Sequence, residues 1–149
     1  MMILPLALPH MAFPWPVSPP TLCIRDHLTS RILLEVPLPW GDTFTIRYIH
    51  SVDRTPVFEV FRAVLGEGLV LEETYFRMFG AGMGHWEGRG EIVQAGEWIK
   101  IRDIRQPLGR FLLRVGSPGV DHTVLLDGRQ WNLSELAAGR RVEVFLLEE

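Results

Sequence analysis

The chain has 149 residues, of which 47% are hydrophobic and 22% charged, a composition typical of one globular domain rather than a disordered segment. Its net charge of −3 excludes the strongly basic surface that nucleic-acid binding usually needs. The single cysteine, Cys23, excludes an intramolecular disulfide and a zinc site built on several cysteines.

Residues 1–20 carry no Lys, Arg, Asp or Glu, as in many export signals and membrane anchors. However, prolines such as Pro5, Pro9 and Pro14 interrupt the apolar run, and no basic residue precedes it. We interpret residues 1–20 as an apolar leader. It is either the remnant of a signal or anchor, or a proline-rich arm that packs on the domain formed by residues 21–149.

From residue 21 onward, short apolar runs alternate with turn signals every ~8–12 residues, a rhythm typical of an all-β sandwich or barrel. We predict strands at about residues 22–26, 31–37, 43–50, 57–65, 69–78, 97–104, 109–115, 122–126 and 141–147. Long helical periods between these runs are absent, so a parallel α/β sheet is not favoured. The predicted fold class is all-β, as a single antiparallel β-sandwich or partly open barrel.

Two local signals refine this prediction near the carboxyl end. Asp127-Gly128, between HTVLL and RQWNL, is a strong hairpin signal. The segment NLSELAAG predicts one short helix before the last strand, with Asn132 as its N-cap, Glu135 three residues later and Gly139 at its end.

A polar cluster is expected on one face of the meander formed by residues 43–78. Pairing outward from a turn at Asp53-Arg54 places Tyr48 opposite Glu59, and pairing outward from a turn at Glu67 places Glu59 opposite Tyr75. Because side chains alternate faces along a strand, this register puts the polar residues on one side. The cluster comprises Tyr48, His50, Glu59, Glu73, Tyr75 and Arg77.

The cluster allows two kinds of site and one structural interpretation. His50 with Glu59 and Glu73 is a candidate ligand set for a divalent metal ion. Arg77 with the two tyrosines is suited to an anionic ligand. Alternatively, the face is simply solvated, with Arg77 pairing with a glutamate across the strands.

Residues 79–91 form a second candidate surface because they contain five glycines. Nothing helical follows them and no Gly-Lys-Ser/Thr is present, so a phosphate-cradling loop is not favoured. We predict a mobile or tightly curved connection between two sheets, with Gly80, Gly82 and His85 as candidate ligand-binding residues. His122, at the start of a strand, is expected to be a hydrogen-bonded structural residue that meets His50 only if their strands adjoin.

The segments FTIRYIHSVDRTPVFEVFR and LVLEETYFRMFGAGM resemble the signature of DUF1850, a bacterial domain of unknown function. The later LLRVGSPGVDHTVLLDG and LSELAAGRRVEVFL are similar to its carboxyl-terminal half. The positions that match the signature are Tyr48, His50, Ser51, Val52, Pro56, Val57, Glu59, Glu73, Phe76, Phe79, Gly80, Ala81 and Gly82. The chain departs from the family in its leader, which is usually a clearer signal or anchor, and at Gly84, where proline is common.

The resemblance implies a small extracytoplasmic or membrane-associated β-domain, although a cytoplasmic location stays open. Genes of this family commonly lie beside TRAP transporters of the TAXI type, whose binding proteins capture small organic anions. The resemblance thus implies an accessory subunit, with the transporter's membrane subunit or its substrate-binding protein as partner. It supplies no catalytic residue and no cofactor.

We therefore expect a non-enzymatic accessory or ligand-sensing domain of such an uptake system. One alternative is a metal-dependent or acid–base enzyme that uses His50, Glu59 and Glu73. Another is a structural domain that mediates contacts between copies of the chain.

Overall fold

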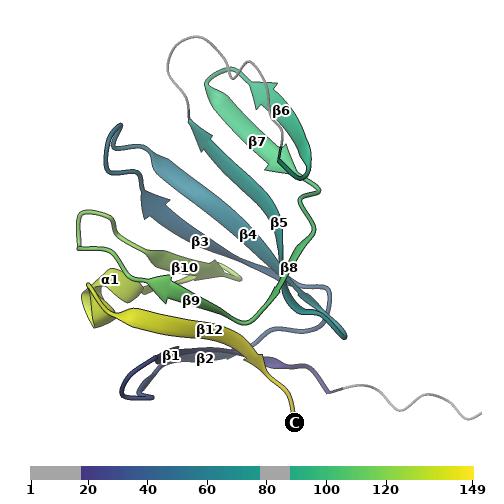
Figure 1. Cartoon of the computed structure of the whole chain (residues 1–149), viewed down its shortest axis with the longest axis vertical. Helices are drawn as coiled ribbons and strands as arrows, with labels where there is room; N and C mark the ends of the chain where they lie inside the picture. Colours follow the sequence, from purple (N-terminus) through teal and green to yellow (C-terminus); the bar gives the residue numbers. More distant parts are fainter. Residues whose placement is uncertain (1–17, 78–87) are drawn as a thin grey trace, which may run out of the picture.

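The computed structural model describes residues 18–77 and 88–149, and Figure 1 shows them as antiparallel strands with one short helix. The first strands are β1 (Thr21–Asp26), β2 (Ile32–Pro37), β3 (Thr43–Ile49), β4 (Pro56–Val64), β5 (Gly68–Arg77) and β6 (Glu91–Ala95). The remaining elements are β7 (Trp98–Arg102), β8 (Gln106–Gly109), β9 (Phe111–Arg114), β10 (Thr123–Leu126), β11 (Arg129–Asn132), α1 (Leu133–Ala137) and β12 (Arg141–Leu147). The predicted all-β class is confirmed.

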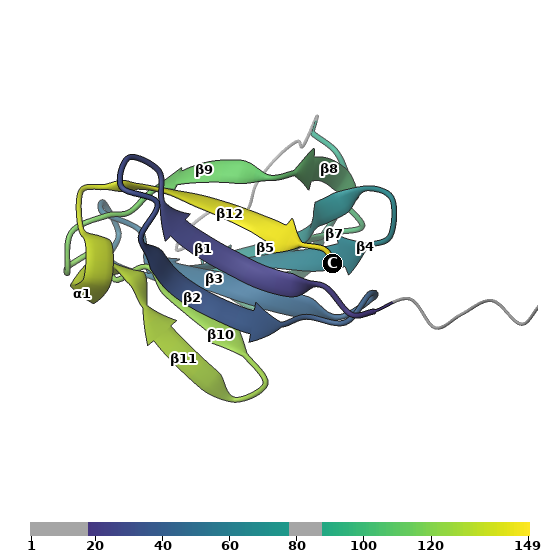
Figure 2. The same cartoon turned by 90° about the horizontal axis from the view of Figure 1, so that it is seen from below.

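The strands form two sheets that pack as a sandwich. The small sheet has the order β2-β1-β12-β9, and the large sheet has the order β11-β10-β3-β4-β5-β7-β6, with β8 also paired to β5. Figure 2 shows the small sheet lying over part of the large one. The outer end of the large sheet, formed by β6 and β7, extends beyond the small sheet in Figure 1.

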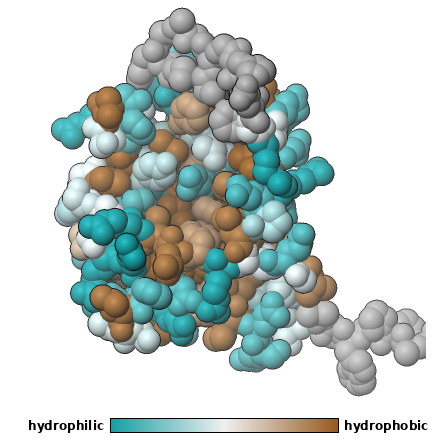
Figure 3. Space-filling view, in the orientation of Figure 1, coloured by the Kyte–Doolittle hydropathy of each residue, from teal (hydrophilic) through white to brown (hydrophobic). Residues whose placement is uncertain are grey.

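The main core lies between the facing sides of the two sheets. Alternate residues of each strand point inward, such as Leu22 and Ile24 of β1, Phe44 and Ile46 of β3, and Val142 of β12. Each of these five side chains is at most 1% exposed. Hydrophobic side chains also reach the surface, where they gather near the centre of the face shown in Figure 3.

The structure corrects the predicted elements at three strands. β6 and β8 were not predicted, and residues 97–104 contain only the short strand β7. β6 and β7 form a hairpin around Gly96, which has a φ of 62°. Both belong to the same sheet as β5, so the prediction that residues 79–91 connect two sheets is wrong.

The predicted helix and hairpin near the carboxyl end are confirmed. The Asn132 side chain accepts a hydrogen bond of 3.0 Å from the backbone N–H of Glu135, and α1 is followed by Gly139 with a φ of 76°. Strands β10 and β11 pair around Asp127-Gly128, where both residues have positive φ.

The register of the first hairpin differs from the predicted one by two residues. Tyr48 lies opposite Val57, and Ile49 opposite Pro56, so the turn spans residues 50–55 rather than two residues. His50 and Thr55 close this turn with a backbone hydrogen bond of 2.9 Å. A shift of two residues preserves the face of each side chain, and Tyr48 and Glu59 remain on one side.

The second hairpin contains a β-bulge that the prediction missed. Phe61 pairs with Leu71, but Val60 pairs with Glu73, which leaves Glu72 as the extra residue. Beyond this bulge every side chain of β5 changes face relative to the predicted register. Glu73 and Tyr75 therefore point to the outer face of the large sheet, whereas Glu59 points inward.

Candidate functional site

The structure divides the predicted polar cluster between two cavities on opposite faces of the large sheet. Tyr48, His50 and Arg77 line one of them, and Glu73 and Tyr75 line the other. Glu59 lies on the inner face, between Ile46 of β3 and Thr74 of β5. The expectation of one six-residue cluster is wrong because the bulge at Glu72 turns the second half of β5 over.

The first cavity has a volume of about 500 Å³ and lies at the end of β3 and β5. Its lining comprises Tyr48, His50, Asp53, Thr55, Val57, Thr74, Phe76 and Arg77. His50 Nδ1 lies 3.0 Å from Asp53 Oδ1, within the exposed turn between β3 and β4. Desolvation raises the pKa of Asp53, but its hydrogen bond with Thr55 and the nearby His50 outweigh this, so the pKa lies below its ordinary value.

Glu59, Tyr48 and His122 lie near one another on the inner face, with the Tyr48 and His122 rings 5.2 Å apart. Burial raises the pKa of Glu59, and burial together with the Glu59 charge raises the pKa of Tyr48. Burial also lowers the pKa of His122, although Asp121 acts in the opposite direction. All three groups are thus shifted toward their neutral forms.

His122 has a structural role, as its position at a strand start indicated. It is 8% exposed, and its Nδ1 accepts a hydrogen bond of 2.9 Å from the Gly116 backbone N–H. Its own backbone N–H donates to the Ser134 hydroxyl at 2.9 Å. The strands β3 and β10 do adjoin, but the ring that His122 contacts is that of Tyr48 rather than His50.

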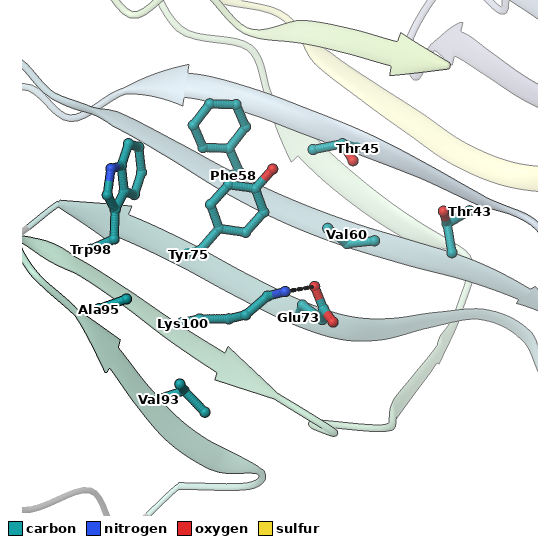
Figure 4. Close-up of a pocket in the computed structure, with 10 residues that line it drawn as sticks. All are labelled: Thr43, Thr45, Phe58, Val60, Glu73, Tyr75, Val93, Ala95, Trp98 and Lys100. Atoms are coloured by element: carbon teal, nitrogen blue, oxygen red, sulfur yellow. Dashed lines mark ion pairs between the residues drawn. The ribbon is translucent and has the colours of Figure 1, made fainter. Parts of the chain in front are cut away.

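The second cavity, here called the outer groove, lies on the outer face of the large sheet and has a volume of about 750 Å³. Thr43, Thr45, Phe58, Val60, Glu73, Tyr75, Val93, Ala95, Trp98 and Lys100 line it, and Figure 4 shows them. Cross-strand pairing explains this composition, because Phe58, Tyr75, Lys100 and Val93 form one row across β4, β5, β7 and β6. With Thr43 and Thr45 of β3, the outer groove is therefore built by five neighbouring strands.

An aromatic cluster forms one end of the outer groove. The Phe58 and Tyr75 rings stack with centroids 4.5 Å apart and an interplanar angle of 7°. The Trp98 ring centroid lies 6.1 Å from each of them, and Trp98 is 37% exposed. Figure 4 shows the three rings standing side by side above the sheet. Such a cluster presents flat apolar surface to solvent.

An ion pair between Lys100 and Glu73 lies next to these rings. Lys100 Nζ is 3.1 Å from Glu73 Oε2 and 5.9 Å from the centre of the Tyr75 ring. Burial raises the pKa of Tyr75, with Lys100 lowering it and Glu73 raising it. Because both partners of the ion pair are partly exposed, the pair contributes little to stability, on the order of 0–1 kcal/mol. Lys100 can therefore exchange Glu73 for another anion with only a small loss of folding free energy.

The proposed metal ligands do not converge. Glu73 pairs with Lys100 on the outer face, His50 contacts Asp53 in an exposed turn, and Glu59 lies on the inner face. Among residues 18–77 and 88–149, no three His, Cys, Asp or Glu side chains are grouped so that they could hold a metal ion. The candidate residues Gly80, Gly82 and His85 lie outside the described residues.

Sequence reasoning missed Phe58, Trp98 and Lys100 as members of a site. Trp98 and Lys100 alternate with the buried Ile99 and Ile101 in WIKIR, so the pattern does indicate that they share a face. The pairing of β7 with β5, which brings them to Tyr75, depends on contacts far apart in the sequence. Arg77 also differs from expectation, since it pairs with Glu97 and lies over the Trp98 ring.

The fold and the outer groove define a small antiparallel β-sandwich with an aromatic cavity on one sheet. Residues 44–133 match the family described as Domain of unknown function (DUF1850), and the chain belongs to this family. This region contains β4 to β11, all of β3 except Thr43, and every residue that lines the outer groove except Thr43. Comparisons with curated proteins and with solved structures gave no match.

Within the part of the chain that the structure describes, no helix has the length and apolar character needed to cross a bilayer.

Proposed function

We propose that the protein is a non-enzymatic ligand-binding β-domain whose outer groove holds a small organic anion with a flat apolar part. The observation that carries this proposal is the combination of three adjacent aromatic rings with a lysine ammonium group in a cavity of about 750 Å³. Ligand sites in proteins are mostly apolar, with a few polar groups that fix orientation.

The aromatic rings supply the apolar contact surface. A flat ligand group that contacts the Trp98 ring or the exposed edges of Phe58 and Tyr75 would gain roughly 0.5–1.5 kcal/mol per ring pair beyond its area burial. Phe58 and Tyr75 already stack on each other, so their orientation is fixed before the ligand arrives. Such preorganisation reduces the entropy lost on binding.

The anionic preference follows from Lys100. Its ammonium group lies beside the rings, and its ion-pair partner Glu73 is a partly exposed carboxylate. A ligand carboxylate that replaces Glu73 would form a charge-assisted hydrogen bond with Lys100. The Thr43 and Thr45 hydroxyl groups, at the other end of the outer groove, can donate hydrogen bonds to further ligand oxygens.

No observation favours the alternative of an enzyme in which His50, Glu59 and Glu73 act together, because these side chains lie in three separate environments. A binding role needs only the groups of the outer groove.

For the partner, we propose a TRAP-type transporter of the TAXI class, to which the protein would contribute as an accessory or ligand-sensing domain outside the cytoplasm. Membership of the DUF1850 family supports this proposal. Affinity purification of the tagged chain from its native membranes tests it: we expect the transporter's membrane subunit or its binding protein to copurify. Recovery of the tagged chain without either subunit would contradict the partner.

The ligand proposal is tested by isothermal titration calorimetry with benzoate and phenylacetate, and with benzyl alcohol as an uncharged analogue. We expect the carboxylates to bind more tightly than the alcohol. We also expect Trp98→Ala and Lys100→Gln each to weaken carboxylate binding by about tenfold, which corresponds to about 1.4 kcal/mol.

A matched control is Trp131→Phe, because Trp131 lies on β11 at the far edge of the same sheet. This variant should bind the carboxylates as the natural protein does. Equal affinity of the natural protein for charged and uncharged probes, or unchanged binding in Trp98→Ala, would contradict the proposal.

A further inference from the structure

A row of basic residues crosses three neighbouring strands of the small sheet. Arg141 of β12 lies directly opposite Arg114 of β9 in the register. On the other side of β12, the backbone N–H of His27 donates a 3.0 Å hydrogen bond to the Arg141 carbonyl, which continues the pairing of β1 with β12. His27, Arg141 and Arg114 therefore lie side by side.

The three side chains share the outer face of the small sheet. Val142 and Leu113, the partners in the next position, pack into the core, so Arg141 and Arg114 point away from it. Opposed Cβ atoms in antiparallel strands are only about 4.5–5.5 Å apart, and like charges in this position are destabilising. A negatively charged partner would offset this repulsion between the two arginines.

The carboxylates nearest to this row are already engaged. Glu143, the next residue of β12 on this face, accepts hydrogen bonds from Arg25 and Arg110. Asp26 accepts from Arg140 and from the backbone N–H groups of Leu28 and Thr29. Its pKa is well below the ordinary range because of the Arg140 hydrogen bond, followed by that from Thr29.

The side chains of Arg114 and Arg141 have no hydrogen-bond or ion-pair partner among residues 18–77 and 88–149. Both also line a cavity of about 390 Å³, whose other lining residues are Asp26, His27, Leu28, Gly139 and Arg140. The Asp26 carboxylate in this lining is already paired with Arg140. The positive charge of these two exposed guanidinium groups thus faces one hollow. This hollow lies on the other sheet from the outer groove and is independent of the ligand proposed there.

We propose that this hollow is a binding site for a compact oxyanion, a phosphate or phosphoryl group held between Arg114 and Arg141 with His27 beside them. Each guanidinium presents donors in a planar fork that matches phosphate oxygens. Two guanidinium groups and an imidazole together carry more N–H donors than the two oxygens of one carboxylate can accept. A phosphate, with three or four oxygens, can accept more of these hydrogen bonds. The bound anion would also remove the repulsion between the two arginines.

The test is isothermal titration calorimetry with inorganic phosphate at low ionic strength. We expect phosphate to bind more tightly than acetate, and Arg114→Gln and Arg141→Gln each to weaken phosphate binding by about tenfold. Without phosphate, both variants should melt at or above the temperature of the natural protein, because the repulsion is gone. The matched control is Arg129→Gln, which removes an arginine whose ring contact is with Trp131 on β11 and should leave binding unchanged.

A second arm identifies the source of the phosphoryl group. Sedimentation with phosphatidylcholine vesicles that contain phosphatidylglycerol measures binding to a lipid headgroup, and the same arginine variants are compared. The site would be assigned to a lipid phosphate if the natural protein binds the vesicles, free phosphate competes with this binding, and the arginine variants lose it. The absence of variant-sensitive binding to both phosphate and vesicles would overturn the proposal.

Discussion

Burial on the inner face shifts two titratable side chains, Glu59 and His122, in opposite directions. The pKa of Glu59 is raised and that of His122 is lowered, so the folded protein favours the neutral form of each. Glu59 has no hydrogen-bond or ion-pair partner among the described residues, whereas His122 is bonded through Nδ1 to the Gly116 N–H. The same burial therefore has different consequences at the two positions.

Glu59→Gln should stabilise the protein at neutral pH. Because the folded pKa of Glu59 exceeds its ordinary value of 4.5, the natural protein loses stability as the pH rises through the interval between the two values. The variant lacks this loss, so the difference in the free energy of unfolding should be largest at pH 7 and vanish below pH 4.5.

Urea denaturation across this pH range measures the effect. Glu67→Gln, in an exposed turn, is the matched control and should show no such pH-dependent gain. Destabilisation by Glu59→Gln at pH 7 would show that the carboxylate makes a favourable contact in the folded state.

His122 should make the protein less stable in mild acid. Its folded pKa lies below the ordinary value of 6.5, so the stability it supports is complete above that value and is lost as the pH falls toward the folded pKa. Protonation of Nδ1 also removes the acceptor for the Gly116 N–H.

His122→Leu should lower the free energy of unfolding at pH 7 by roughly 1–3 kcal/mol, because it leaves the Gly116 N–H without a partner. It should also flatten the pH dependence of unfolding below 6.5. His50→Gln, at an exposed position, is the control and should retain that dependence. A His122→Leu protein as stable as the natural one would contradict the structural role of the imidazole.

At the scale of elements, the strands were predictable but their exact pairing was not. Alternating apolar residues and turn signals indicated β3, β4, β5 and β12 within a few residues, and Asn132 indicated the start of α1. The bulge at Glu72 has no such signal, since no glycine or proline marks it, and it decides the face of Glu73 and Tyr75. The outer groove depends further on β6 and β7, whose pairing with β5 is set by tertiary contacts.

The N-cap of α1 provides a test at this scale. Asn132→Ala should lower the free energy of unfolding by about 0.5–2 kcal/mol, since the Glu135 N–H loses its acceptor. Asn132→Ser, which retains a capping oxygen, should recover part of this loss. Guanidinium denaturation compares the three proteins, and equal stability of the alanine and natural proteins would show that the cap does not stabilise the helix.

At the scale of the whole molecule, the two proposed sites lie on opposite outer faces of the sandwich. The outer groove occupies the outer face of the large sheet, and the arginine row occupies the outer face of the small sheet. The shared core between the sheets, whose side chains are almost fully buried, separates the two faces. The match to the DUF1850 family covers every residue of the outer groove except Thr43, but only Arg114 of the arginine row.

The central claim, that the outer groove binds a small organic anion, is tested most directly by chemical-shift mapping of the isotope-labelled protein titrated with phenylacetate. We predict the largest shifts at the backbone N–H groups of Phe58, Tyr75, Trp98 and Lys100, and their loss in Trp98→Ala. Shifts that gather elsewhere on the chain, or that persist unchanged in Trp98→Ala, would contradict the account.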